Sequence, residues 1–174
     1  MIDSHQHFWN YDPERDTWIT ADMSAIQKDF YPDSVHFNSL GIEACVAVQA
    51  SSSEEETLFL LALAEQSDFI QGVVGWVDLR AENIENILEK YSTEKIVKGF
   101  RHILQGAEKG FMLQPNFIKG LKQLSKQHYT YDLLIYANQI QEAIELIKSV
   151  EDLPIVLDHI AKPSIKTKSM QDWE

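Results

Sequence analysis

Short apolar segments alternate with longer amphipathic segments along almost the whole chain, and this alternation limits the fold more than any other feature. The apolar segments predict strands at Met1–His7, Ala44–Ala50, Gln71–Val77, Val97–His102, Tyr131–Tyr136 and Pro154–His159. Between them, apolar residues recur at helical spacing, which predicts helices over Glu54–Gln66, Ala81–Tyr91, Pro115–Gln127 and Gln139–Ser149. The continuously apolar strands are typical of parallel strands covered on both faces. An α/β fold with an inner parallel sheet is therefore expected.

Two architectures produce this alternation, an open doubly wound sheet and a closed (β/α)8 barrel. Polar residues gather at or near the carboxyl ends of the expected strands: His5, His7, Gln49, Asp78, Arg101, His102, Tyr136, Asp158 and His159. Barrel enzymes assemble their active sites at that end. Open sheets also bind ligands there, but no glycine-rich phosphate loop follows the first strand here. The polar residues therefore favour the barrel.

The first strand contains two histidines one residue apart, His5 and His7. Side chains alternate along a strand, so both imidazoles point to the same face. Two imidazoles on one face are a ready pair of metal ligands. A pair of solvated or core histidines is the alternative reading of such a short motif.

Composition narrows the choice of partner. The 174 residues carry a formal net charge of −12, which argues against nucleic acid and anionic membrane surfaces as partners. A small-molecule substrate is the simpler expectation. The single cysteine, Cys45, lies in an apolar run and is expected to be a buried thiol. With no signal-peptide pattern or membrane-length apolar run, we expect a cytoplasmic protein.

Four ordered motifs resemble a known family: Ile2–Trp9 (IDSHQHFW), Gly75–Leu79 (GWVDL), Lys98–His102 (KGFRH) and Leu157–Pro163 (LDHIAKP). They resemble the amidohydrolase-2 family of the amidohydrolase superfamily, and most closely its branch of fuconolactonases, rhamnonolactonases and dicarboxylate lactone hydrolases. The resemblance implies a TIM barrel of the metal-dependent hydrolase type.

The resemblance also implies that residues 1–174 form a single barrel domain that is truncated at its C-terminus. Six strands are expected, whereas a barrel of about 250 residues has eight. The aspartate that family members carry after the eighth strand has no counterpart here. Residues Ser169–Glu174 would begin a further helix. The open edges of the first and sixth strands could pair with a second copy, so a homo-oligomer is one expectation.

The same resemblance supplies a site. It implies that His5, His7 and His159 bind a divalent metal, with zinc as the first candidate, and that hydroxide formed near neutral pH attacks a lactone carbonyl. A site without metal, in which the histidines hold the carbonyl directly, stays open. His159 and Arg101 are the expected catalytic residues.

Substrate contacts are expected from Trp9, Arg101, His102 and Tyr136. Arg101 would bind a carboxylate or a polarised lactone oxygen through its planar fork, or would instead be a structural arginine paired with a carboxylate. His102 follows it on the opposite face and could equally act from behind the site. Asp158 is expected to point away from His159.

These residues predict a hydrolase that opens a lactone of a sugar acid or a dicarboxylate. Because Arg101 is the only basic strand-end residue besides the histidines, sugar lactones are favoured. Two alternatives stay open: a metal-dependent decarboxylase of the same superfamily, and a catalytically incomplete scaffold.

Overall fold

The computed structural model describes residues 1–34, 37–168, 170 and 173. The chain divides into two compact units, Met1–Trp76 and Val77–Glu174. Each unit contributes three parallel strands that pair in chain order. The expected α/β architecture, with six strands in βα succession, is confirmed.

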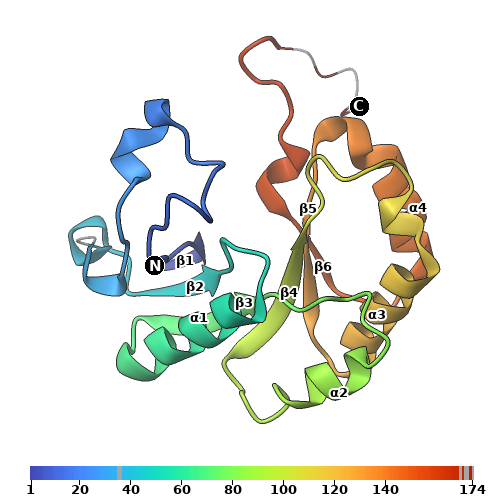
Figure 1. Cartoon of the computed structure of the whole chain (residues 1–174), viewed down its shortest axis with the longest axis horizontal. Helices are drawn as coiled ribbons and strands as arrows, with labels where there is room; N and C mark the ends of the chain where they lie inside the picture. The colour runs from blue at the N-terminus through green and yellow to red at the C-terminus, as the bar shows by residue number, and fades with distance from the viewer. Residues whose placement is uncertain (35–36, 169, 171–172, 174) are drawn as a thin grey trace. The chain divides into compact units, whose positions relative to one another are not determined.

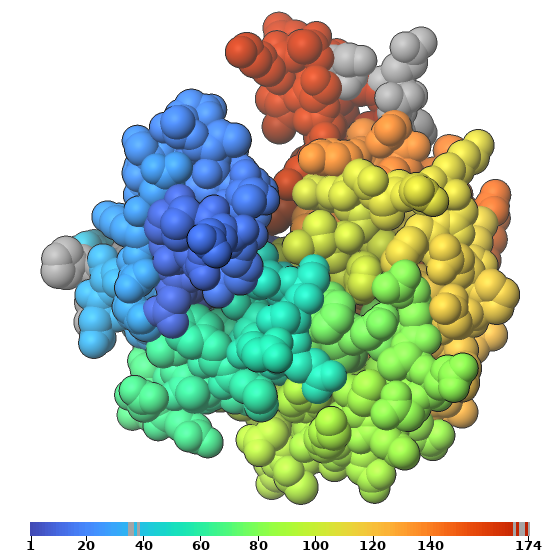
Figure 2. Space-filling model, viewed as in Figure 1, coloured from blue at the N-terminus to red at the C-terminus, as the bar shows by residue number. Residues whose placement is uncertain are grey.

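The first unit contains β1 (Ile2–Gln6), β2 (Ala44–Val48) and β3 (Ile70–Gly75), with α1 (Glu54–Gln66) lying beside them (Figure 1). Between β1 and β2 the chain makes a long excursion with short 3-10 helices at Ala21–Ile26, Pro32–Ser34 and Phe37–Leu40. Much of this excursion, in blue, is at the surface in the space-filling view (Figure 2).

Local chemistry explains where α1 begins and how it is fixed to β3. The Ser53 hydroxyl accepts a hydrogen bond from the Glu56 amide at 3.2 Å, and three glutamates occupy the positive first turn. The Thr57 hydroxyl accepts from the Trp76 amide at 2.7 Å and donates to the Trp76 carbonyl at 2.8 Å. Gly75 leaves room for this contact, because a Cβ there would lie 2.6 Å from Thr57.

The second unit contains β4 (Val97–Ile103), β5 (Thr130–Leu134) and β6 (Ile155–Leu157). Its helices are α2 (Ile84–Glu89), α3 (Pro115–Lys126) and α4 (Ile140–Ser149). Figure 1 shows α3 and α4 together on one side of these strands. The buried core of the unit lies between the two layers and includes Phe117, Leu121, Leu124, Tyr131 and Leu146.

Side-chain alternation on β4 decides which residues face the helices. Phe100 packs against Tyr91 and Tyr129, with ring centroids 5.6 Å and 5.0 Å away, and is fully buried on the helix side. Arg101, the next residue, therefore faces the opposite side of the sheet. In the β4–β5 register Arg101 pairs with Asp132, which places the two side chains on the same face.

The expected elements are confirmed with small shifts at their ends. Helix α1 has the predicted bounds. Helix α2 begins later than expected, because Ala81 and Ile84 bond to carbonyls three residues earlier and form tight turns. The helix expected to begin at Ser169 lies largely outside the described residues. No helix among the described residues is long and apolar enough to cross a membrane.

Candidate active site

His5 on β1 and His7, which directly follows the strand, converge as their spacing predicts. Their Nε2 atoms lie 3.2 Å apart, with the rings edge to face. Two nitrogen ligands at about 2.0–2.1 Å from a tetrahedral zinc ion would be roughly 3.3 Å apart. The pair therefore has the separation that two ligands of one metal ion require.

His7 is held in the orientation that a ligand needs. Its Nδ1 lies 2.7 Å from the Val48 carbonyl at the end of β2. A carbonyl oxygen only accepts hydrogen bonds, so Nδ1 carries the proton and Nε2 keeps its lone pair. This backbone contact is the usual support of a metal-binding histidine.

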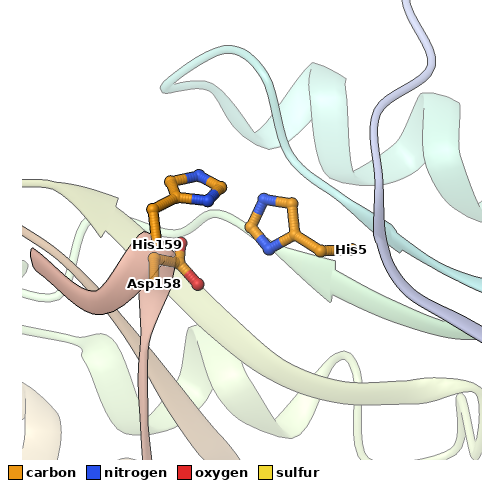
Figure 3. Close-up of side chains that lie close together, drawn as sticks. All are labelled: His5, Asp158 and His159. Carbon is orange, nitrogen blue, oxygen red and sulfur yellow. The ribbon is translucent and has the colours of Figure 1, made fainter. Parts of the chain in front are cut away.

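In the second unit, Asp158 and His159 directly follow β6. Figure 3 shows the side chains of Asp158 and His159, together with that of His5 on β1. A carboxylate oxygen of Asp158 and a ring nitrogen of His159 lie within 4.8 Å of each other. The expectation that Asp158 points away from His159 is therefore wrong. Strand alternation no longer applies there, because β6 ends at Leu157 and the chain turns tightly.

Arg101 forms a buried ion pair with Asp158. Its Nη1 donates to Oδ2 of Asp158 at 2.9 Å, and the two side chains are 4% and 1% exposed. Asp158 is therefore the carboxylate partner expected if Arg101 is a structural arginine. The pair fixes the start of the turn that carries His159.

Asp132 on β5 is the functional-site candidate that the sequence reading missed. It is 5% exposed and shares a face with Arg101. Burial raises the pKa of its carboxyl group to about 7; the charge of Asp158 adds to this effect and that of Arg101 opposes it. A carboxylate inside an otherwise apolar strand pattern is the sequence signal that could have singled it out.

The raised pKa of Asp132 predicts a pH-dependent stability. Its folded-state pKa of about 7 exceeds its ordinary value of 3.8, so the stability present below about pH 4 is lost as the pH rises through 7. The asparagine in Asp132→Asn stays neutral at every pH, so the variant should lose about 1–2 kcal/mol less unfolding free energy than the wild type as the pH rises. This difference is smaller than the full pKa shift implies, because buried sites relax around a charge. Urea unfolding from pH 4 to pH 8 measures the difference.

The exposed Asp68 offers the matched substitution. Asp68→Asn should leave the pH dependence of the unfolding free energy as in the wild type. If Asp132→Asn also showed the wild-type slope, Asp132 would not hold a proton in the folded state.

His102 lies on the helix side of β4, away from Arg101. Its ring is 5.4 Å from the ring of Phe111 and 5.5 Å from that of Phe117. Burial lowers the pKa of His102 to about 4; the charge of Arg80 adds to this effect and that of Asp78 opposes it. A neutral histidine among aromatic rings fits packing better than substrate contact.

The two other expected substrate residues occupy loops. Tyr136 follows β5 and is 45% exposed; its amide donates to Oε1 of Gln139 at 2.9 Å. Trp9 follows β1 and pairs with Phe30 of the long excursion through both backbone groups and through rings 4.7 Å apart. The indole Nε1 of Trp9 is buried and makes no hydrogen bond to the described residues. Tyr136 is open to a ligand, whereas Trp9 packs on the excursion.

Comparison with known proteins assigns the family. A family model for amidohydrolases matches residues 2–174. The chain belongs to the amidohydrolase family. It is 36% identical over 168 residues to an L-fucono-1,5-lactonase of Burkholderia multivorans, covering 94% of this chain and 56% of the relative. It is 27% identical over 175 residues to an L-fucono-1,5-lactonase of Burkholderia ambifaria, covering 99% and 60%.

A solved structure carries the same fold. The crystal structure of an amidohydrolase from Burkholderia multivorans with bound zinc matches with a TM-score of 0.88 and 36% identity, over 93% of this chain and 58% of the other. The likeness confirms the expected fold class, the α/β TIM-barrel type of the amidohydrolases, of which six strands are present here. This amidohydrolase chain spans less than two thirds of the length of these relatives.

Proposed function

We propose that the whole protein is a hydrolase that opens the lactone ring of a sugar acid, with L-fucono-1,5-lactone as the first substrate to test. The names of the two Burkholderia relatives support the substrate class. The observation that carries the proposal is the His5–His7 pair, whose Nε2 atoms are spaced as ligands of one metal ion.

We further propose that His5, His7 and His159 hold a divalent metal, with zinc as the first candidate. The zinc in the related crystal structure supports this choice. Asp158 joins the proposed set, because its carboxylate lies beside His159. When bound, such a metal supplies Lewis acidity and makes water a nucleophile near neutral pH.

The chain's own residues would position the substrate and move the proton. The Val48 carbonyl keeps His7 in one tautomer. Arg101 neutralises and orients Asp158, which sets the backbone of His159. In a site without metal, His159 would instead bind the lactone carbonyl or take the proton of the attacking water. Tyr136 would donate a hydrogen bond to a ring oxygen of the substrate.

Removing the metal tests the proposal. The protein expressed from its complete gene should hydrolyse L-fucono-1,5-lactone, with acid release followed by a pH indicator and metal content by mass spectrometry. A chelator should remove most of the activity and zinc should restore it. Activity that survives complete metal loss would support direct carbonyl binding by the histidines. Release of CO2 from an aromatic acid without lactone opening would instead identify a decarboxylase.

The location and partners of the protein also remain proposals. We propose a cytoplasmic enzyme with a small-molecule substrate, no nucleic-acid or membrane partner, and self-association through strand edges as an open expectation. Cys45 is consistent with a reducing compartment: it is fully buried, and burial raises the pKa of its thiol to about 12. A thiol with such a pKa stays protonated and unreactive.

A further inference from the structure

The turn after β6 has an unusual backbone. Four consecutive residues, none of them glycine, adopt the left-handed conformation, with φ of 49° at His159, 50° at Ile160, 57° at Ala161 and 47° at Lys162. This conformation is unfavourable for most residues other than glycine, asparagine and aspartate, and most of all for a β-branched one. Such strain persists only where the surrounding structure enforces it, and it concentrates at functional sites.

The turn directs the side chains of Lys162 and His159 to the same side of the backbone. The Lys162 amide donates to the His159 carbonyl at 2.9 Å, which closes a turn of four residues. Residues three apart in such a turn project on the same side. The pKa of Lys162 is lowered by partial burial and by the charge of Arg101, while Asp158 opposes them. Lys162 therefore lies near the Arg101–Asp158 pair.

Lys162 also connects the loops that follow β4, β5 and β6. Its Nζ donates to Oε1 of Gln105 at 3.1 Å, and it lies 5.9 Å from the centroid of the Tyr136 ring. Gln139 fixes these loops, because its Nε2 donates to the Leu104 carbonyl at 2.8 Å and its Oε1 accepts from the Tyr136 amide at 2.9 Å. Gln105 and Tyr136, the two side chains that contact Lys162, therefore lie on loops that Gln139 holds together.

This place is rich in hydrogen-bond donors. Nε2 of Gln105 is buried and makes no hydrogen bond within the described part of the chain. The ammonium group of Lys162 has three donors, of which Gln105 accepts one. The Tyr136 hydroxyl adds a further donor on a half-exposed side chain. The hydroxyl and ring oxygens of a sugar lactone are the acceptors that such donors bind.

We propose that Lys162, supported by Gln105 and Tyr136, forms a subsite that binds the hydroxyl-rich ring of a sugar-acid lactone beside His159. This inference rests on the proposed function and adds Lys162 and Gln105 to the expected substrate contacts. The left-handed turn is the device that presents Lys162 and His159 to the same ligand. A lysine that merely ties the loops together would affect stability and not substrate affinity.

Kinetics of the full-length protein test the subsite. Lys162→Met should raise KM for L-fucono-1,5-lactone at least about 10-fold while kcat changes less than about 3-fold, since a hydrogen bond to a charged group is lost from substrate binding. Lys162→Arg should restore most of the affinity. Lys166→Met, at an exposed lysine in the following turn, is the matched control and should leave both constants unchanged.

The kinetic results distinguish a failure of the proposed subsite from a failure of the proposed function. Lactonase activity with an unchanged KM in Lys162→Met, or with kcat and Tm falling together, would overturn the subsite and leave the function intact. A wild-type protein without lactonase activity would overturn the proposed function and the inference with it.

A second variant tests the strained turn. Ile160 is 56% exposed, so Ile160→Gly should relieve strain without opening the core and raise the Tm by about 2–4 °C. It should also lower kcat/KM, because the turn loosens. Ile144→Gly, at a 39% exposed isoleucine of the right-handed helix α4, should lower the Tm instead. Unchanged kcat/KM in Ile160→Gly would overturn the role of the turn.

Discussion

In the full-length protein, His159→Asn is expected to lower kcat/KM for the proposed lactone hydrolysis by about 10³-fold while the protein stays folded. A positioned acid, base or ligand contributes roughly 10²–10⁴-fold. His159 is exposed, so its removal leaves the core intact. Asparagine tolerates the left-handed backbone at φ 49°, so the substitution removes the imidazole and keeps the turn. Steady-state kinetics and a thermal melt measure the two effects.

His128 provides the matched control. It is also an exposed histidine with a left-handed backbone, at φ 62°, but it lies after α3, away from the β6 turn. His128→Asn should leave kcat/KM unchanged. Zinc content measured by mass spectrometry should fall in His159→Asn and not in His128→Asn. Equal activity in the two variants would remove His159 from the site.

The second large effect is expected at the buried ion pair. Arg101→Met should lower the free energy of unfolding by about 3–5 kcal/mol, because it leaves the carboxylate of Asp158 buried without its cation. Asp132 adds to the penalty, because the charge of Asp158 disfavours its ionised form and the opposing charge of Arg101 would be lost. Urea unfolding followed by tryptophan fluorescence measures the loss.

The exposed ion pair of Arg80 and Asp78 is the matched control, because the same arginine-to-methionine substitution there should cost much less unfolding free energy. These side chains are 40% and 42% exposed and lie 3.3 Å apart, so Arg80→Met should cost at most about 1 kcal/mol. A stable Arg101→Met variant with a raised KM would point to substrate binding by Arg101 and against its structural role. A destabilised variant with an unchanged KM would show the reverse.

The sequence predicted the elements well because their signals are local. Helix α1 has an N-cap serine, acidic residues in its first turn and helical apolar spacing, and its bounds were predicted without error. The convergence of His5 and His7 was also predicted from a local rule, the alternation of side chains along the strand expected over Met1–His7. The ends of α2 and of the strands were less accurate, because tight turns there satisfy the backbone without extending the element.

The arrangement around Arg101 required the tertiary structure. Its partner, Asp158, is 57 positions away, and strand alternation gave the wrong orientation for that aspartate because the strand had already ended. Asp132 drew no attention in the sequence, since only the β4–β5 register places it beside Arg101. His102 was expected either at the substrate or behind the site, and only its contacts with Phe111 and Phe117 place it in the helix layer.

The sequence by itself determined the βα succession, the family and the histidine pair, all of which depend on residue types at fixed spacings. Only the tertiary structure decided which charges are buried together, and it alone revealed the left-handed turn from His159 to Lys162. No glycine or asparagine marks that turn in the sequence. Its conformation is unfavourable locally and is enforced by surrounding contacts, so local propensity could not have predicted it.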